Sequence, residues 1–401
     1  MTVRSTIRGS VAELQGEGRG IALLTIASCS FLLIGVQMIY PVLLPELRAT
    51  YGFDLTMAGV LLAVLWIANA VGQVPGGVLA DGIGEGRTMV ASTLISGGTL
   101  VLIVVANSLV VLFVATFLFG LGIALFGVAR YTALDYLFPE RVGTTVGIVL
   151  AAADAGQAVL PPLAGVIAAI VIWQLGFAFT LPLFVVVAVA LWVYVPVKSS
   201  DSGGSTNTIS RANLGYVGEA LRQRTVLYGS AVFVVYVMVW ITFTGFYPTY
   251  VIDEKGLSSL TAAVLFGTFF AFGVLIKPLS GIAYDRVGIR GSLLTISAIS
   301  GAALLAFPFL EGVGPIAAAT LFIAPILGSG TIAQSHVIEA LPSDIKGTAL
   351  GIVRTGGMTM AAVSPVVFGA VADRGFFDEA FLSLSVLAGV MILLVIRIPP
   401  E

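Results

Sequence analysis

The chain has 401 residues, of which 58% are hydrophobic and only 10% are charged, with a formal net charge of −2. A soluble domain carries about 25% charged residues, so this composition excludes a soluble protein. No basic cluster indicates nucleic-acid binding. The single cysteine, Cys29, and the single histidine, His336, cannot supply an internal disulfide or a thiol- or histidine-rich metal site. We therefore expect no metal and no cofactor.

Apolar segments of about 20 residues recur along the chain, and each is long enough to cross roughly 30 Å of hydrocarbon. The polar N-terminal stretch runs into a full-length span, so we expect no cleaved signal peptide. The pattern predicts an all-α membrane protein with twelve transmembrane helices. The expected spans are 20–41, 57–80, 88–106, 109–134, 143–170, 175–195, 227–247, 259–284, 291–309, 314–338, 347–371 and 380–397.

One long Ser- and Gly-rich segment, residues 197–225, follows the sixth span. It predicts a cytoplasmic linker between two six-helix bundles, 20–196 and 226–401, with residues 1–19 as an N-terminal tail. The second part of the linker, "RANLGYVGEALRQR", has the pattern of a short amphipathic helix on the membrane surface.

The placement of Lys and Arg predicts the orientation. With both termini inside, 13 of the 19 basic residues fall in cytoplasmic segments, and only Arg48, Lys255 and Arg374 fall outside. The positive-inside rule therefore favours cytoplasmic termini. We expect a monomeric, multi-pass protein of the cell membrane.

The two halves repeat at an offset of 204 residues. "GTTVGIV" (143–149) aligns with "GTALGIV" (347–353), and the same offset holds across four helices. Parallel repeats joined by a linker are typical of one large transporter architecture, so the bundles should be pseudo-symmetric. The other aligned pairs are Gly77 with Gly281, Asp81 with Asp285, Gly84 with Gly288, Asp135 with Glu339, Pro161 with Pro365, and Gly165 with Gly369.

"GVLADGIGEGR" resembles G-x-L-x-D-[RK]-x-G-[RK]-[RK], the motif between helices two and three of the major facilitator superfamily. It departs at Gly82, Glu85 and Gly86, but the second copy, "GIAYDRVGIR", keeps Asp285 and Arg286. "FPERVGTTVGI" also resembles the family's junction after helix four. The resemblance covers essentially the whole chain and implies the family's twelve-helix transporter fold, without indicating a substrate. The gating motif would comprise Gly77, Asp81, Gly84, Arg87, Asp135, Gly281, Asp285, Arg286, Gly288, Arg290 and Glu339.

The motif has a physical interpretation. An Asp at a cytoplasmic helix end can lie against the N-terminus of a helix in the other half, where amide N–H groups favour negative charge. That contact would close the inner face. Ion pairs of Arg286 with Glu339 and of Arg87 with Asp135 would reinforce it. The alternative is that these are only solvated loop charges.

Charged side chains within spans are costly unless they are paired or face water, so each is a candidate site. Lys277 and Arg354 both lie ~12 Å from the inner ends of their helices, and Asp154 lies ~18 Å deep. The two cations predict an anionic substrate between them, unless they snorkel to the interface. Asp154 is either their fixed partner, a proton carrier, or a member of an interhelical hydrogen bond. Arg130, five residues before Asp135, can snorkel, and its substrate role is the weaker expectation.

The repeat aligns Lys277 with Gln73, which predicts a pseudo-symmetric pair across a central cavity. Tyr40 on the first span, with Tyr236 and Trp240 on the seventh, would add aromatic walls, or else pack at helix interfaces. His336 is more typical of an interfacial histidine than of a proton switch.

The sequence thus predicts a permease for a small organic anion such as a carboxylate, working by alternating access with proton coupling. Basic residues on helices eight and eleven resemble the oxalate–formate exchanger and monocarboxylate porter branches of the superfamily. Nitrate porters place arginines on helices two and eight, which Gln73 and Lys277 do not match. The alternative is a proton-coupled drug or metabolite efflux antiporter, because "GQAVLPPLAG" resembles the helix-five antiporter motif weakly. No nucleophile–base pair or cofactor motif supports an enzyme.

Overall fold

The computed structural model describes residues 19–195, 211–342 and 345–399, without the side chains of 211–215 and 347. Eleven helical stretches in these ranges are long and apolar enough to cross a membrane. One of them, 259–309, has 51 residues and contains two of the predicted spans. The prediction of an all-α, twelve-span protein is confirmed. The predicted tail, apart from Arg19, and the first part of the linker lie outside the described residues.

The N-terminal half contains α2 (Arg19–Gln37), α3 (Ile39–Tyr51), α4 (Leu55–Ile83), α5 (Glu85–Val104), α6 (Leu109–Leu137), α7 (Val142–Ile170), α8 (Leu175–Ala178) and α9 (Leu181–Tyr194). The C-terminal half follows α10 (Arg211–Arg222) and contains α11 (Arg224–Asp253), α12 (Ser259–Ala306), η2 (Phe307–Phe309), α13 (Val313–Ile323), η3 (Ala324–Gly328), α14 (Ser329–Ala340), α15 (Lys346–Ala361), α16 (Ser364–Ala372) and α17 (Phe377–Arg397). Four predicted spans are therefore interrupted helices, formed by α2 with α3, by α8 with α9, by α13 with α14, and by α15 with α16.

The backbone repeats between the halves as the sequence does. Gly84, which separates α4 from α5, has a φ of 90°, and Gly288, which kinks α12, has a φ of 68°. Gly52 and Gly256 have φ values of 68° and 63°. Side chains disfavour this left-handed region, so glycine is required at these turns. Both pairs are 204 residues apart, and the pseudo-symmetry extends to the turn conformations.

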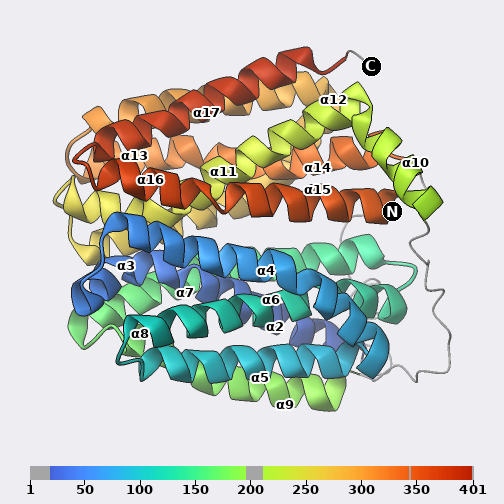
Figure 1. The fold of residues 1–401 in the computed structure, drawn as a ribbon, viewed down its shortest axis with the longest axis horizontal. Helices are drawn as coiled ribbons and strands as arrows, with labels where there is room; N and C mark the ends of the chain where they lie inside the picture. Colours follow the sequence, from blue (N-terminus) through green and yellow to red (C-terminus); the bar gives the residue numbers. More distant parts are fainter. Residues whose placement is uncertain (1–18, 196–210, 343–344, 400–401) are drawn as a thin grey trace, which may run out of the picture.

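The two halves form two layers (Figure 1). The blue and green helices of the N-terminal half lie below the yellow to red helices of the C-terminal half. The α4–α5 turn and α10 lie at one end of the bundle, which we call the α10 end. The α3, α8, α13 and α16 helices reach the opposite end, which we call the α3 end.

The predicted amphipathic helix is present as α10. Val217 and Ala220 on this helix are buried in a small cluster with Val337, Leu341 and Ile345. Its apolar face therefore packs against the connection between α14 and α15, whereas the sequence predicted that this face lies on the membrane surface. The C-terminal half itself thus shields these apolar side chains from water.

Candidate functional site

Lys277 on α12 and Asp154 on α7 form an ion pair between the two halves. Lys277 Nζ lies 2.5 Å from Asp154 Oδ1. Gln157 Nε2, three residues along α7, donates to the same oxygen over 3.1 Å. Lys277 does not snorkel to the interface, and the carboxylate compensates its charge in this conformation.

Arg130 on α6 turns into the protein instead of snorkelling, and it is only 8% exposed. Its Nη1 donates to Ser30 Oγ on α2 over 3.1 Å, and its Nη2 donates to Tyr131 Oη over 3.0 Å. The guanidinium carbon also lies 5.5 Å from the ring centroid of Phe126. These neutral partners stabilise the position of the cation without neutralising it.

Arg354 on α15 of the other half reaches the same tyrosine. Arg130 donates to the Tyr131 hydroxyl group, and the positive charges of both Arg130 and Arg354 act on that group. Among the described residues, neither arginine forms an ion pair with a carboxylate. The structure therefore places two guanidinium groups, one from each half and neither paired with a described carboxylate, where both charges act on a single hydroxyl group.

An aromatic wall stands beside this charged site. The charge of Asp154 acts on the hydroxyl group of Tyr236 on α11. The Tyr236 ring stacks on Trp240, with ring centroids 6.4 Å apart and an angle of 10° between the ring planes. Trp240 meets Trp66 of the other half edge to face, with centroids 5.1 Å apart. A Cβ on Gly330 would lie 2.4 Å from Tyr236 Cε1, so only glycine at 330 admits the tyrosine ring. The wall joins the two halves through π contacts.

Two predicted site residues are not brought to this cluster. Tyr40 is fully buried and packs on Phe119 and Phe177 of its own half, with centroids 5.9 Å and 5.1 Å away. Gln73 is half-buried and makes no hydrogen bond with the described residues. The expected pseudo-symmetric position of Gln73 opposite Lys277 across a cavity stays a prediction.

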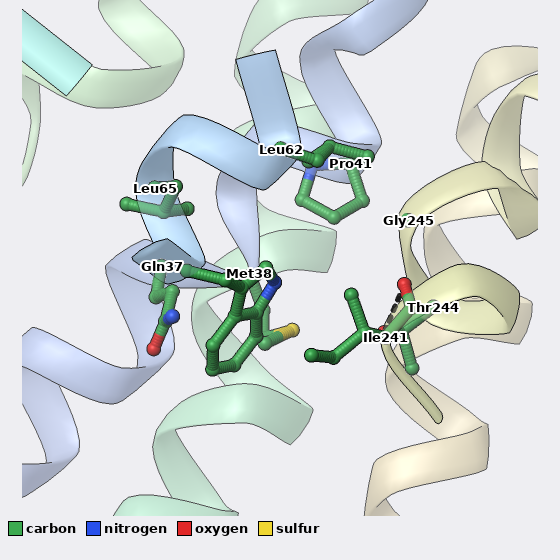
Figure 2. A pocket seen from close by; sticks show the side chains of 9 residues that line it. Gln37, Met38, Pro41, Leu62, Leu65, Ile241, Thr244 and Gly245 are labelled. Atoms are coloured by element: carbon green, nitrogen blue, oxygen red, sulfur yellow. Dashed lines mark hydrogen bonds between the residues drawn. The ribbon is translucent and has the colours of Figure 1, made fainter. Parts of the chain in front are cut away.

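A small cavity lies between the halves next to the aromatic wall. Figure 2 shows Gln37, Met38 and Leu62 of the N-terminal half facing Ile241 and Thr244 of the C-terminal half. The volume that a water-sized sphere can occupy is about 10 Å³, which is roughly the space for one water molecule. Gln37 Nε2 is buried there without a hydrogen-bond partner in the part of the chain that the structure describes. The two halves thus pack closely against each other at this cavity and leave little space between them.

The halves are joined at the α3 end. Arg48 Nη1 lies 2.9 Å from Asp253 Oδ2, which links α3 to α11. Asp373, which follows α16, accepts hydrogen bonds from the backbone N–H groups of Leu55 and Thr56 over 2.8 Å and 2.7 Å. A Cβ on Gly369 would lie 2.1 Å from the Leu55 carbonyl oxygen. Backbone contact this close requires glycine, as small-residue helix packing does in membranes.

The predicted gating motif at the α10 end makes none of its expected ion pairs among the described residues. Asp81 is exposed, and its carboxylate forms no hydrogen bond or ion pair with the other half in the described chain. Within the described ranges the expected ion pair of Arg87 with Asp135 is not formed; both side chains are exposed to water, where such pairs gain little. The expected pair of Arg286 with Glu339 is not formed there either.

Glu339 instead accepts a hydrogen bond from the hydroxyl group of Tyr284. Both predicted ion pairs are therefore corrected for this conformation. The role of the motif in gating stays a prediction, since the residues of the motif have not met their partners here.

The sequence alone did not indicate several of the residues that make these contacts. Gln157 had a signal, because residues three apart on a helix are neighbours and Asp154 was already a candidate. Tyr131 follows Arg130 directly, yet adjacency along a helix does not predict a shared contact. Ser30 and Asp373 act on partners that are 100 and about 317 residues away, and no local pattern indicates them.

Twelve membrane spans in two halves, with charged side chains meeting between the halves, define a membrane transporter. The family model described as Major Facilitator Superfamily matches residues 26–365. The chain belongs to this family.

Curated relatives match over most of their length. The chain is 24% identical to the hexuronate transporter of Bacillus subtilis (strain 168), covering 88% of each chain. It is 27% identical to the probable sulfoacetate transporter SauU of Cupriavidus necator, covering 86% of each. It is 25% identical to the probable nitrate transporter NarT of Staphylococcus haemolyticus, covering 82% of this chain and 83% of the relative.

Solved structures share the fold at low identity. The nucleoside transporter NupG superposes with a TM-score of 0.79 at 13% identity, covering 94% of this chain and all of that one. A D-xylose–proton symporter superposes with a TM-score of 0.77 at 16% identity, covering 94% and 98%. These likenesses describe the architecture and not the substrate.

Proposed function

We propose that this chain is a secondary active transporter for a small organic anion such as a carboxylate. The observation that carries the proposal is that the charges of Arg130 and Arg354 both act on the Tyr131 hydroxyl group, while neither arginine has a carboxylate partner among the described residues. Two guanidinium groups held inside a membrane protein favour an anion between them. The planar fork of arginine suits a carboxylate, because it can donate two parallel hydrogen bonds.

Lys277 completes the proposed anion site in a second step. Its charge is compensated by Asp154 in this conformation, so it does not compete for the anion. A proton on Asp154 would neutralise the carboxylate and release Lys277 as a third cation. Binding of a proton and binding of an anion would then favour each other, as proton-coupled transport requires.

The names of the relatives support an anionic substrate. Hexuronate, sulfoacetate and nitrate are all anions, although each name describes only its own protein. We favour an organic anion over nitrate, because Gln73 and Lys277 stand where nitrate porters of the superfamily place arginines. The aromatic wall of Trp66, Trp240 and Tyr236 would contact the apolar part of such a substrate.

Transport would proceed by alternating access. The two halves would rock about the central site, and the present conformation would be the one closed at the α3 end. The distribution of Lys and Arg supports a cytoplasmic location for the α10 end and insertion in the cell membrane. On this view the central site now faces the cytoplasm.

Uptake by the full-length protein in proteoliposomes tests the proposal. The probes are labelled monocarboxylates, dicarboxylates and sugar acids, together with nitrate and sulfate, each with and without an imposed pH gradient. Arg130→Gln and Arg354→Gln should each abolish uptake of the transported anion. Arg374→Gln is the matched control, because Arg374 is exposed and lies outside the site.

Wild-type uptake by both site variants would overturn the anion site. Proton release driven by a hydrophobic cation, without uptake of any anion, would replace the proposal with the efflux antiporter.

A further inference from the structure

The contacts of Asp154 are asymmetric. Lys277 Nζ and Gln157 Nε2 both donate to Oδ1. Oδ2 accepts no hydrogen bond from the described residues, yet it is not sealed from solvent. One oxygen therefore holds the carboxylate in place while the other stays open to a proton from water.

The two donors belong to different rigid bodies. Gln157 shares α7 with Asp154, so it moves together with the carboxylate. Lys277 lies on α12 of the other half, so its distance from Asp154 changes when the halves rock. Gln157 is only 5% exposed, and its amide has little water to replace a lost partner.

We propose that Gln157 is the positioning residue that keeps Asp154 oriented and sets the pH at which Oδ2 takes up a proton after Lys277 has left. This inference rests on the proposed proton coupling. The hydrogen bond from the Gln157 amide to Oδ1 favours the ionised carboxylate, and because both residues lie on α7 it does not depend on the relative position of the two halves. Gln157 thereby prevents Asp154 from holding its proton through the whole transport cycle. The proton comes from solvent, forms the O–H bond at Oδ2 and returns to solvent, while Lys277 stays an ammonium throughout.

The other titratable and charged groups on the helices packed against α7 do not donate a hydrogen bond to Asp154 in the described chain, apart from Lys277. Lys277 forms an ion pair with Asp154, and the charge of Asp154 acts on the Tyr236 hydroxyl group. On α2, Cys29 contacts Thr93 instead. The remaining ones, on α6 and α3, have their own partners or lie at the helix ends: Arg130 with Ser30 and Tyr131, Arg48 with Asp253, and Glu46, Asp135 and Tyr136.

Infrared difference spectroscopy of the full-length protein in liposomes tests this role without a known substrate. The carboxylic acid band of Asp154 is identified by its loss in Asp154→Asn and is titrated between about pH 4 and about pH 9. The titration is run in a Lys277→Gln background, which removes the mobile partner. Gln157→Met keeps the side-chain volume and removes the donor.

We expect Gln157→Met to move the midpoint about one unit towards higher pH, since a donor to the ionised form is lost. Gln157→Glu should move it further in the same direction. Gln334→Met is the matched control, because Gln334 donates to the Gly330 carbonyl and not to Asp154. Its midpoint should equal that of Lys277→Gln alone.

Equal midpoints for Gln157→Met, Gln157→Glu and the control would overturn the role of Gln157 while leaving proton coupling intact. Absence of any band that Asp154→Asn removes would overturn both the role and the proposed coupling.

Discussion

Asp373 of the C-terminal half accepts a hydrogen bond from the backbone N–H of Thr56, over 2.7 Å, at the first turn of α4 in the N-terminal half. The same carboxylate accepts from Leu55 N and from the Thr56 hydroxyl group. A carboxylate at a helix N-terminus is stabilised by the unpaired N–H groups there. This is the kind of contact that the sequence predicted for Asp81, found at the opposite end of the bundle.

Asp373→Ala should weaken closure of the α3 end. Loss of the charged acceptor should shift the ratio of closed to open molecules roughly tenfold towards open. Spin labels at Thr50→Cys and Glu254→Cys, in a Cys29→Ser background, would report the distance between the halves at this end. Glu311→Ala is the matched control, because Glu311 is an exposed carboxylate at the same end. An unchanged distance distribution in Asp373→Ala would show that Asp373 does not hold this end closed.

Gly369→Ala should separate the halves at the same end by a steric route. The added Cβ would lie 2.1 Å from the Leu55 carbonyl oxygen, so the backbone of one half must shift away from the other. The closed population in the spin-label experiment should disappear. Gly389→Ala is the control, because a Cβ there meets nothing within 4 Å. A closed population equal to wild type would contradict the packing described here.

Arg130→Lys should fail to restore transport. Lysine keeps the positive charge but lacks the planar guanidinium group. It cannot donate to both Ser30 and Tyr131 and also offer two parallel N–H groups to an anion. The affinity for the transported anion should fall roughly 10- to 100-fold, which corresponds to one or two charged hydrogen bonds. Uptake measured over a range of substrate concentrations checks this, and wild-type affinity in Arg130→Lys would leave Arg130 with only a structural role.

Asp154→Asn and Lys277→Gln should each lower thermal stability more than the double variant does. Removing one member of this partly buried ion pair leaves an uncompensated charge, whereas removing both leaves none. Melting curves of the four proteins in detergent form a double-mutant cycle. If the two single effects simply add in the double variant, the ion pair seen here does not persist in solution.

Asp81→Asn should not change the stability of the present conformation, because Asp81 is exposed and has no partner in the described chain. It should lower the population closed at the α10 end, where the motif is expected to act. Spin labels on the α4–α5 turn and on α15 would measure that population. Loss of the present conformation instead would place Asp81 in a contact that this structure does not contain.

Much of the architecture could be predicted from local information. The spans follow from runs of apolar residues, since a helix satisfies its own backbone in hydrocarbon. The repeat follows from matched glycines such as Gly84 and Gly288, because a left-handed turn tolerates few other residues. The site could be predicted only as a set of isolated charges. Arg130 was expected to reach the interface, and its inward turn depends on Ser30 of another helix.

The sequence by itself determined that this protein is a twelve-span transporter of the superfamily with cations inside the membrane, because hydrophobicity, charge and glycine positions are properties of single segments. Only the tertiary structure decided which cation is compensated. Lys277 meets Asp154 and the two arginines meet Tyr131, since these pairings depend on how α6, α7, α12 and α15 pack. Which end of the bundle is closed also depends on that packing. Asp373 and Asp81 have equivalent chemistry, and the relative position of the two halves selects the one that is engaged.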